Sequence, residues 1–139
     1  MIEYRKVDGS FDLSGKSAIV VGGAGGIGGA TAEMYAKKGA NIAIADCKDN
    51  VKEAAARLAE TYGVKTIGLK CDVTKQSDID QTVAAVTEAF GEINILANMP
   101  GYVELESAEC IGVDVIEKHL AINAVGVFRM SQAVANQMI

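Results

Sequence analysis

The sequence predicts an α/β fold in which a doubly wound parallel sheet carries helices on both of its faces. Short apolar runs rich in β-branched residues alternate with stretches of about a dozen residues whose apolar positions repeat at helical spacing. The connections between these runs are short, and the composition shows no break along the chain. We therefore expect a single domain over residues 1–139, without a linker.

Two cycles of strand and helix are expected in the first half of the chain. A strand over residues 17–21 leads through a glycine-rich turn into a helix over residues 27–38. A second strand over residues 41–45 precedes a helix whose apolar residues lie between positions 51 and 62. Gly63 is placed to cap the C-terminus of that helix.

A third cycle begins with a strand over residues 66–70 and continues into a helix that Gly91 ends. The apolar face of this helix bears Ile79, Val83, Val86 and Phe90. Ser77 and Asp80 have the spacing of a capping box, so we expect them to close the first turn of the helix.

A fourth strand is expected over residues 93–97, followed by an irregular stretch. A long helical pattern then runs from about Asp114 to the end of the chain, and Gly126 is expected to interrupt it.

Charge and hydropathy exclude several classes of protein. The 139 residues include 13 basic and 18 acidic side chains, and the net charge of −5 argues against a nucleic-acid partner. The first fifteen residues lack the unbroken apolar core of a secretory signal. The longest uncharged run, residues 17–32, contains six glycines and is shorter than the roughly 18 apolar residues that a membrane helix needs. We expect a soluble, cytoplasmic protein with no membrane partner.

The three cysteines, Cys47, Cys71 and Cys110, lie far apart and form no C-x-x-C pair. This pattern fits reduced thiols in a cytosol better than a disulfide framework or a zinc site. We expect all three to be small buried hydrophobic side chains, and we predict no metal site.

The glycine-rich turn after the first strand is the strongest motif in the chain. It reads Val-Gly-Gly-Ala-Gly-Gly-Ile-Gly over residues 21–28 and precedes a predicted helix. The N–H groups of such a helix, from Gly25 through Ile27, can face a pyrophosphate, and glycines let that group approach the backbone. A P-loop is disfavoured because no Lys-Ser or Lys-Thr follows. Two dinucleotide registers fit: Gly23, Gly25 and Gly28 match G-x-G-x-x-G, and Gly22, Gly26 and Gly28 match G-x-x-x-G-x-G.

Asp46 stands at the end of the second predicted strand, 18 positions after Gly28. A carboxylate there can accept hydrogen bonds from the ribose hydroxyls of adenosine and would repel a 2′-phosphate. NAD is therefore favoured over NADP, although Lys48 lies close enough to keep NADP as an alternative.

From Phe11 to its last residue the chain resembles the short-chain dehydrogenase/reductase family. Residues 11–16 resemble the lead-in to the first strand of that family, and Gly22, Gly26 and Gly28 match its glycine motif. Val21 stands where the family usually has Thr. Asp72 and Val73 resemble the Asp-Val pair that contacts the adenine ring.

Two further segments carry the resemblance toward the nicotinamide side of the site. Asn98 to Gly101 occupies the place of the Asn-Asn-Ala-Gly motif, with Met99 and Pro100 departing from it. Residues 122–128 resemble the Asn-x-x-Gly-x-Phe helix segment, in which Asn123 matches the Asn of the catalytic tetrad.

The resemblance implies a Rossmann-like sheet with strand order 3-2-1-4-5-6-7, of which this chain supplies 3-2-1-4. It also implies hydride transfer between NAD and an alcohol or carbonyl substrate. In that family a Tyr serves as general acid and base beside a Lys, a Ser orients the substrate oxygen, and the Asn holds a water in the proton relay.

The Ser and the Tyr-x-x-x-Lys pair of the family are not found in these 139 residues. Tyr4, Tyr35, Tyr62 and Tyr102 all lack a Lys four positions later. His119 has no Ser or Cys nearby to activate, so we expect a structural role for it. We therefore expect a cofactor-binding half that is inactive alone, seen as a fragment, a truncated product or an incomplete record.

Two other functions remain open. The chain could be a non-catalytic NAD-binding or interaction module. It could also be a Rossmann-like methyltransferase that places Asp46 on the ribose of S-adenosylmethionine, which Asp72-Val73 and the Asn123 segment argue against.

The strand over residues 93–97 is built to be central but would lie at an edge of a four-stranded sheet. The last helix would also have lost part of the sheet that it packs against. The apolar residues of this helix are Leu120, Val125, Val127, Phe128, Val134 and Met138. In the family this helix usually forms part of a subunit interface, so we expect a homo-oligomer that uses it.

Overall fold

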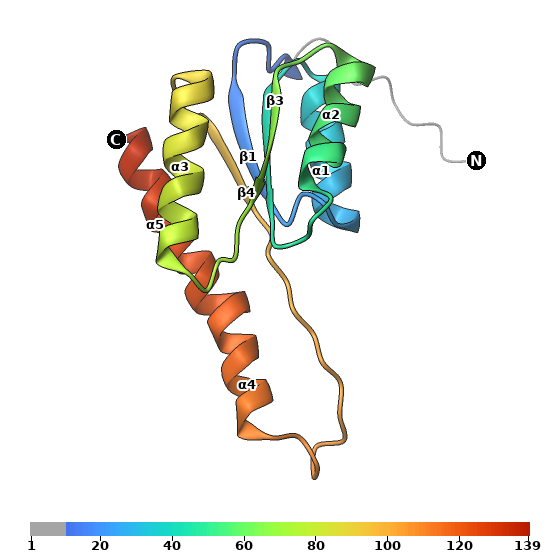
Figure 1. The fold of residues 1–139 in the computed structure, drawn as a ribbon, viewed down its shortest axis with the longest axis vertical. Coiled ribbons are helices and arrows are strands. Elements are labelled where there is room, and N and C mark those ends of the chain that lie inside the picture. Colours follow the sequence, from blue (N-terminus) through green and yellow to red (C-terminus); the bar gives the residue numbers. More distant parts are fainter. Residues whose placement is uncertain (1–10) are drawn as a thin grey trace, which may run out of the picture.

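Four parallel strands form a sheet in the order β3-β2-β1-β4 (Figure 1). The strands are β1 (Ser17–Val21), β2 (Asn41–Asp46), β3 (Thr66–Lys70) and β4 (Ile95–Asn98). The computed structural model describes residues 11–139. The expectation of no secretory signal rests largely on residues 1–10, which lie outside the described residues. The predicted fold class and strand order are confirmed.

Helices cover both faces of this sheet (Figure 1). On one face lie α1 (Gly26–Lys37) and α2 (Val51–Tyr62), and on the other lie α3 (Gln76–Phe90) and α5 (Val127–Met138). All five residues of β1 are buried, because alternate side chains point to opposite helical layers. This two-sided burial explains why the sequence of β1 is a continuous apolar run.

The fourth strand starts two residues later than its predicted position. Its pairing with β1 begins with Ala18 opposite Ile95. Just before that pair, the backbone N–H of Asn94 donates to the carbonyl of Ser17 (2.9 Å), and the side-chain Oδ1 of Asn94 accepts from the N–H of Ser17 (2.8 Å). The side chain thus supplies one of the two bonds between these residues.

The predicted capping box at the start of α3 is wrong. The residue that caps α3 is Lys75, without a side-chain cap, so Ser77 and Asp80 already lie inside the helix. The Oδ1 of Asp80 instead accepts a hydrogen bond from Nε2 of Gln76 at 2.9 Å.

The last helical segment is continuous where the sequence suggested a break at Gly126. The segment α4 (Val113–Leu120) runs through a π-helical turn, η2 (Ala121–Gly126), directly into α5. The backbone of Gly126 is helical, with φ −62° and ψ −44°. A Cβ at this position would lie 2.6 Å from Cγ2 of Val73, so the glycine allows close packing rather than a break.

The cysteine prediction is correct for Cys71, which is buried, and wrong for Cys47 and Cys110, which are exposed. Cys47 comes directly after β2, where the chain leaves the core, and Cys110 belongs to the irregular segment before α4. No helix within residues 11–139 is long and apolar enough to cross a membrane.

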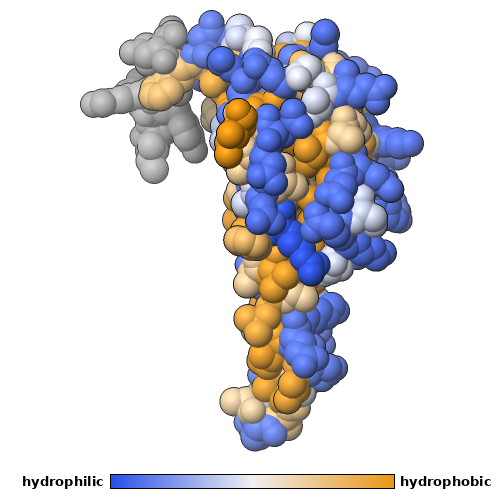
Figure 2. Space-filling model, turned by 90° about the vertical axis from the view of Figure 1, so that its left-hand side faces the viewer, coloured by the Kyte–Doolittle hydropathy of each residue, from blue (hydrophilic) through white to orange (hydrophobic). Residues whose placement is uncertain are grey.

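The helix α4 projects beyond the sheet, and an apolar band follows it along one side (Figures 1 and 2). The exposed large apolar residues of α4, η2 and the start of α5 are Val113, Ile116, Leu120, Val125 and Phe128. Their spacing is three or four residues except across η2, where it is five. Because a π-helical turn bonds residues five apart, this longer step keeps the apolar residues in phase. This apolar stripe is defined by these five residues.

Candidate functional site

The glycine loop between β1 and α1 lies at the carboxyl ends of the strands, against the chain that leaves β4. Gly22 has a φ of +77°, and a Cβ there would lie 2.4 Å from the carbonyl oxygen of Met99. A Cβ on Gly28 would lie 2.2 Å from the carbonyl oxygen of Gly22. Neither position has room for a side chain, so the loop folds only with glycine at both.

Gly26, unlike Gly22 and Gly28, has room for a side chain. A Cβ on Gly26 would meet no atom within 4 Å, so the space above this residue is open. Gly26 is the first residue of α1, and Gly25 caps the helix without a side-chain hydrogen bond. The first-turn N–H groups have no acceptor within the helix, and the open space above Gly26 leaves room for an anion to approach them. In the other register, a Cβ on Gly23 would lie 2.8 Å from the carbonyl oxygen of Val20, so packing requires that glycine as well.

Asp46 ends β2 and is only 7% exposed. Its Oδ2 accepts a hydrogen bond from the N–H of Ala24 (3.1 Å), and its Oδ1 accepts one from the N–H of Lys48 (3.2 Å). The carboxylate thus braces the glycine loop, a role that the sequence spacing did not indicate. Each carboxylate oxygen keeps a further lone pair, so Asp46 can still accept a bond from a ribose hydroxyl.

A cavity of about 130 Å³ connects these elements. Five of the predicted cofactor-binding residues line it together: Gly22, Asp46, Asp72, Val73 and Gly101. They come from four different connections, and the parallel sheet brings them to one edge because the strands all end there.

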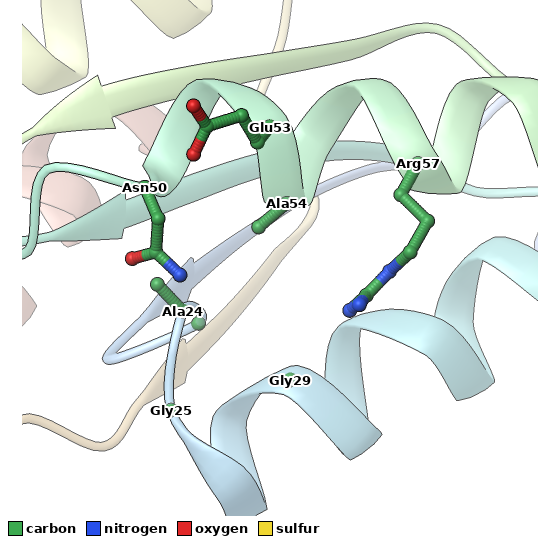
Figure 3. A pocket seen from close by; sticks show the side chains of 8 residues that line it. Ala24, Gly25, Gly29, Asn50, Glu53, Ala54 and Arg57 are labelled. Atoms are coloured by element: carbon green, nitrogen blue, oxygen red, sulfur yellow. The ribbon is translucent and has the colours of Figure 1, made fainter.

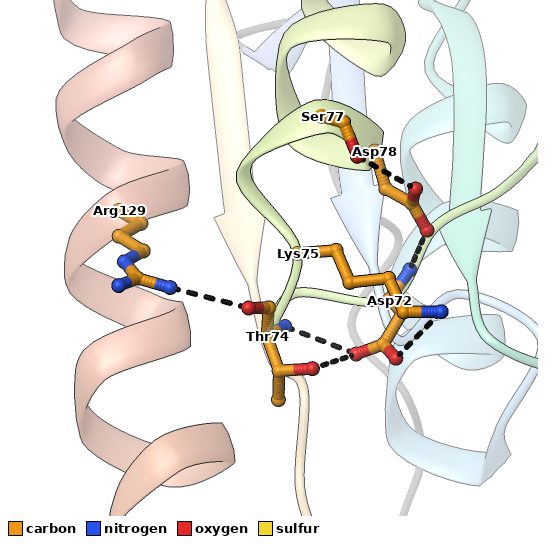
Figure 4. Close-up of polar contacts among 6 residues, drawn as sticks. All are labelled: Asp72, Thr74, Lys75, Ser77, Asp78 and Arg129. Atoms are coloured by element: carbon orange, nitrogen blue, oxygen red, sulfur yellow. Dashed lines mark hydrogen bonds and ion pairs between the residues drawn. The ribbon is translucent and has the colours of Figure 1, made fainter.

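Asp72 sits in the loop between β3 and α3 (Figure 4). Its Oδ1 accepts hydrogen bonds from the N–H (3.0 Å) and the hydroxyl (2.7 Å) of Thr74. These bonds, chiefly that of the hydroxyl, hold the pKa of the Asp72 carboxyl below its usual value. Oδ2 lies 3.7 Å from Nζ of Lys75 and accepts no hydrogen bond from the described residues, so it can receive a donor such as an adenine amino group.

Asn98, at the end of β4, ties the sheet to α5. Its Nδ2 donates to the carbonyl of Val127 (2.8 Å) and to Oγ of Ser131 (2.9 Å). Its Oδ1 is buried and has no hydrogen-bond partner within the described part of the chain. Asn98 is not among the residues that line the cavity with Gly101.

Asn123 lies in the π-helical turn and holds the loop that follows β4. Its Oδ1 accepts from the N–H of Tyr102 (2.9 Å), and its Nδ2 donates to the carbonyl of the same residue (2.8 Å). Its side chain thereby fixes the backbone directly after Gly101.

His119 has a structural position, as expected from the sequence. Its Nε2 accepts from the N–H of Glu104 (3.2 Å), and its Nδ1 lies 2.7 Å from the carbonyl oxygen of Val115. The Tyr102 ring packs edge-on against it with the ring centroids 5.0 Å apart, and Nζ of Lys118 lies 4.0 Å above the Tyr102 ring. No motif in the sequence points to Tyr102.

A second hollow, of about 310 Å³, lies between the glycine loop and α2 (Figure 3). Asn50 points toward Ala24, and the Arg57 side chain extends toward α1 near Gly29 (Figure 3). Nζ of Lys48 would lie 3.7 Å from a Cβ on Gly25. Two basic groups therefore stand near the glycine loop on this side.

Comparison with known proteins gives close relatives in sequence. The chain is 42% identical over 134 residues to a D-threitol dehydrogenase of Mycolicibacterium smegmatis. It is 35% identical over 136 residues to an NAD-dependent glycerol dehydrogenase of Listeria innocua. These alignments cover 96% and 98% of this chain but 51% and 52% of the relatives. The chain thus spans about half the length of the curated relatives it matches.

A solved structure and a family model also match this chain. The crystal structure of an NAD⁺-bound xylitol dehydrogenase matches with a TM-score of 0.85 and 34% identity, over 90% of this chain and 48% of that one. A family model described as short chain dehydrogenase matches residues 16–139. With this match over most of its length and the glycine cradle that it carries, the chain belongs to the short-chain dehydrogenase family.

Proposed function

We propose that this chain is the cofactor-binding half of an NAD-dependent oxidoreductase that interconverts an alcohol and a carbonyl compound. The observation that carries the proposal is the glycine loop, which leaves open space above Gly26 and lines one cavity through Gly22 together with Asp46 and Asp72. The relatives are named for glycerol, D-threitol and xylitol, which supports a small polyol as the alcohol.

Different residues would hold different parts of the cofactor. The backbone from Gly22 through Gly25, Gly26, Ile27 and Gly28 would hold the pyrophosphate, and Asp46 would accept from the ribose of adenosine. Asp72 and Val73 would hold the adenine, and the loop from Asn98 to Gly101 would border the nicotinamide side. When bound, the nicotinamide supplies the group that accepts or gives a hydride.

Asn123 is the member of the catalytic tetrad that this chain carries. Its side chain fixes the backbone of Tyr102, so we assign it the task of holding the nicotinamide-side loop while its helical turn faces the reaction site. The general acid and base, the Lys beside it and the Ser are not among these residues, so the 139-residue chain alone would be inactive.

The apolar stripe and the last helix point to a homo-oligomer. Leu120 is 57% and Phe128 is 64% exposed, which is costly for large apolar side chains unless a partner covers them. A cytoplasmic location agrees with the three free cysteines.

If the chain prefers NAD, the variant Asp46→Asn should lose affinity for NADH and part of its discrimination against NADPH. Removing the charge should weaken NADH binding about tenfold, the worth of a charge-assisted hydrogen bond, and should bring the affinities for NADH and NADPH closer together. Isothermal titration calorimetry measures both. The matched control is Asp49→Asn, which changes an exposed acid that pairs with Lys70 and should leave NADH binding unchanged. Equal affinities of the unmutated chain for NADH and NADPH would contradict the preference.

If this chain binds the cofactor and lacks the acid–base residues, the 139-residue chain should bind NADH but catalyse no reaction. With NAD and glycerol, threitol or xylitol, no NADH should form above the rate without protein, as followed by NADH absorbance. A longer gene product that adds a Ser and a Tyr-x-x-x-Lys should restore turnover. Cofactor-dependent turnover by the 139-residue chain would refute the claim that it lacks the catalytic residues. Binding without turnover in the longest natural product would favour the non-catalytic module.

The oligomer proposal predicts that Phe128→Asp lowers the mass of the particle in sedimentation velocity to that of a monomer, because a buried charge opposes association. Gln81→Asp, at an exposed position on the different helix α3, is the control and should leave the mass unchanged. A monomeric unmutated chain at all concentrations would rule the proposal out.

A further inference from the structure

Arg129 links two parts of the structure that are far apart in sequence. It lies in the first turn of α5 and is half-buried. Its Nη1 donates a hydrogen bond to the carbonyl oxygen of Thr74 at 3.2 Å, across 55 residues of sequence (Figure 4). Arg129 does not line the cavity, so it acts through Thr74.

The loop that contains Thr74 is held by hydrogen bonds between its own residues. The N–H of Lys75 donates to the carbonyl of Asp72 (2.9 Å), and Thr74 donates twice to the Asp72 carboxylate. These internal bonds set the shape of the loop. They do not determine how the loop is oriented toward the cavity, because both partners of each bond move with it.

The orientation of the loop must come from outside contacts. On the β3 side, the N–H of Cys71 donates to the carbonyl of Asp46 at 2.9 Å, and on the α3 side Oδ2 of Asp78 accepts from the N–H of Asp72 at 3.0 Å. On the third side the contacts come from the last helical segment: Gly126 packs against Val73, and Arg129 binds Thr74. Of these two, Arg129 is the charged donor, and such bonds are roughly twice as strong as neutral ones.

We propose that Arg129 is a positioning residue for adenine recognition: its bond to Thr74 holds the Asp72–Thr74 loop so that Oδ2 of Asp72, which pairs with Lys75 but accepts no hydrogen bond from the described residues, meets the adenine amino group. This inference rests on the proposed function, because it assumes that Asp72 faces the adenine of NAD. If the inference is correct, Arg129 in α5 helps to determine which base the cofactor site accepts.

The test compares two cofactors that differ at position 6 of the purine, where a carbonyl oxygen replaces the amino group and N1 gains a proton. Nicotinamide hypoxanthine dinucleotide carries an oxygen where NAD carries the adenine amino group, so it lacks the donor for Asp72. The unmutated chain should bind reduced NAD about tenfold more tightly than the reduced hypoxanthine dinucleotide, as measured by calorimetry. In Arg129→Met, which keeps the length but removes the donors, the ratio should fall to about twofold or less.

A matched control and a second variant separate positioning from stability. Gln132→Met changes an exposed residue of the same helix and should keep the tenfold ratio. Arg129→Lys should recover part of it, because a Lys keeps a charged donor on a long stem. A loss of stability would lower the affinity for both cofactors equally and leave the ratio unchanged. If circular dichroism shows that Arg129→Met does not fold, Arg129→Gln, which is too short to reach Thr74, replaces it.

The outcomes distinguish this inference from the proposed function. A folded Arg129 variant that keeps the full ratio overturns the inference and leaves the proposed function intact. An unmutated chain that binds neither cofactor overturns the proposed function. An unmutated chain that binds both equally overturns the adenine role of Asp72, and with it the positioning role of Arg129.

Discussion

The close approach between the glycine loop and the chain leaving β4 is the constraint on which the rest of the site depends. Gly22 turns with a positive φ against the carbonyl of Met99, and Gly28 packs on the carbonyl of Gly22. Asp46 then fixes the loop from the side of β2. These contacts bring the N-terminus of α1, the end of β2 and the loop after β4 to one point. The cradle at Gly26 is open because its neighbours are already held in place.

The helical segment from α4 to α5 organises the other half of the cavity wall. Its π-helical turn carries Asn123, which fixes the backbone of Tyr102, while α5 contributes the Arg129 bond to Thr74 in the loop between β3 and α3. The same segment bears the apolar stripe on its outer side. An oligomer formed through this stripe would therefore involve the same helical segment that contributes to the wall of the cavity.

Features with a local cause could be predicted from the sequence. The strands follow from short apolar runs, and the cradle from glycines between a strand and a helix. Features that depend on tertiary contacts could not. The bond between Asp46 and Ala24 joins two connections, and the close packing of Gly126 on Val73 depends on a loop more than fifty positions earlier. The misplaced capping box shows the same limit, because α3 starts two residues earlier than predicted and Ser77 is no longer at the cap.

The central claim is that the open space above Gly26 belongs to the pyrophosphate of a dinucleotide, and the variant Gly26→Ala tests it most directly. An Ala Cβ meets no protein atom within 4 Å there, and Ala is a better helix former than Gly, so thermal stability should be kept or slightly raised. The account predicts that calorimetry shows NADH binding weakened by at least about tenfold, because the methyl group occupies the ligand's space. A stable Gly26→Ala chain that binds NADH as tightly as the unmutated chain would contradict it.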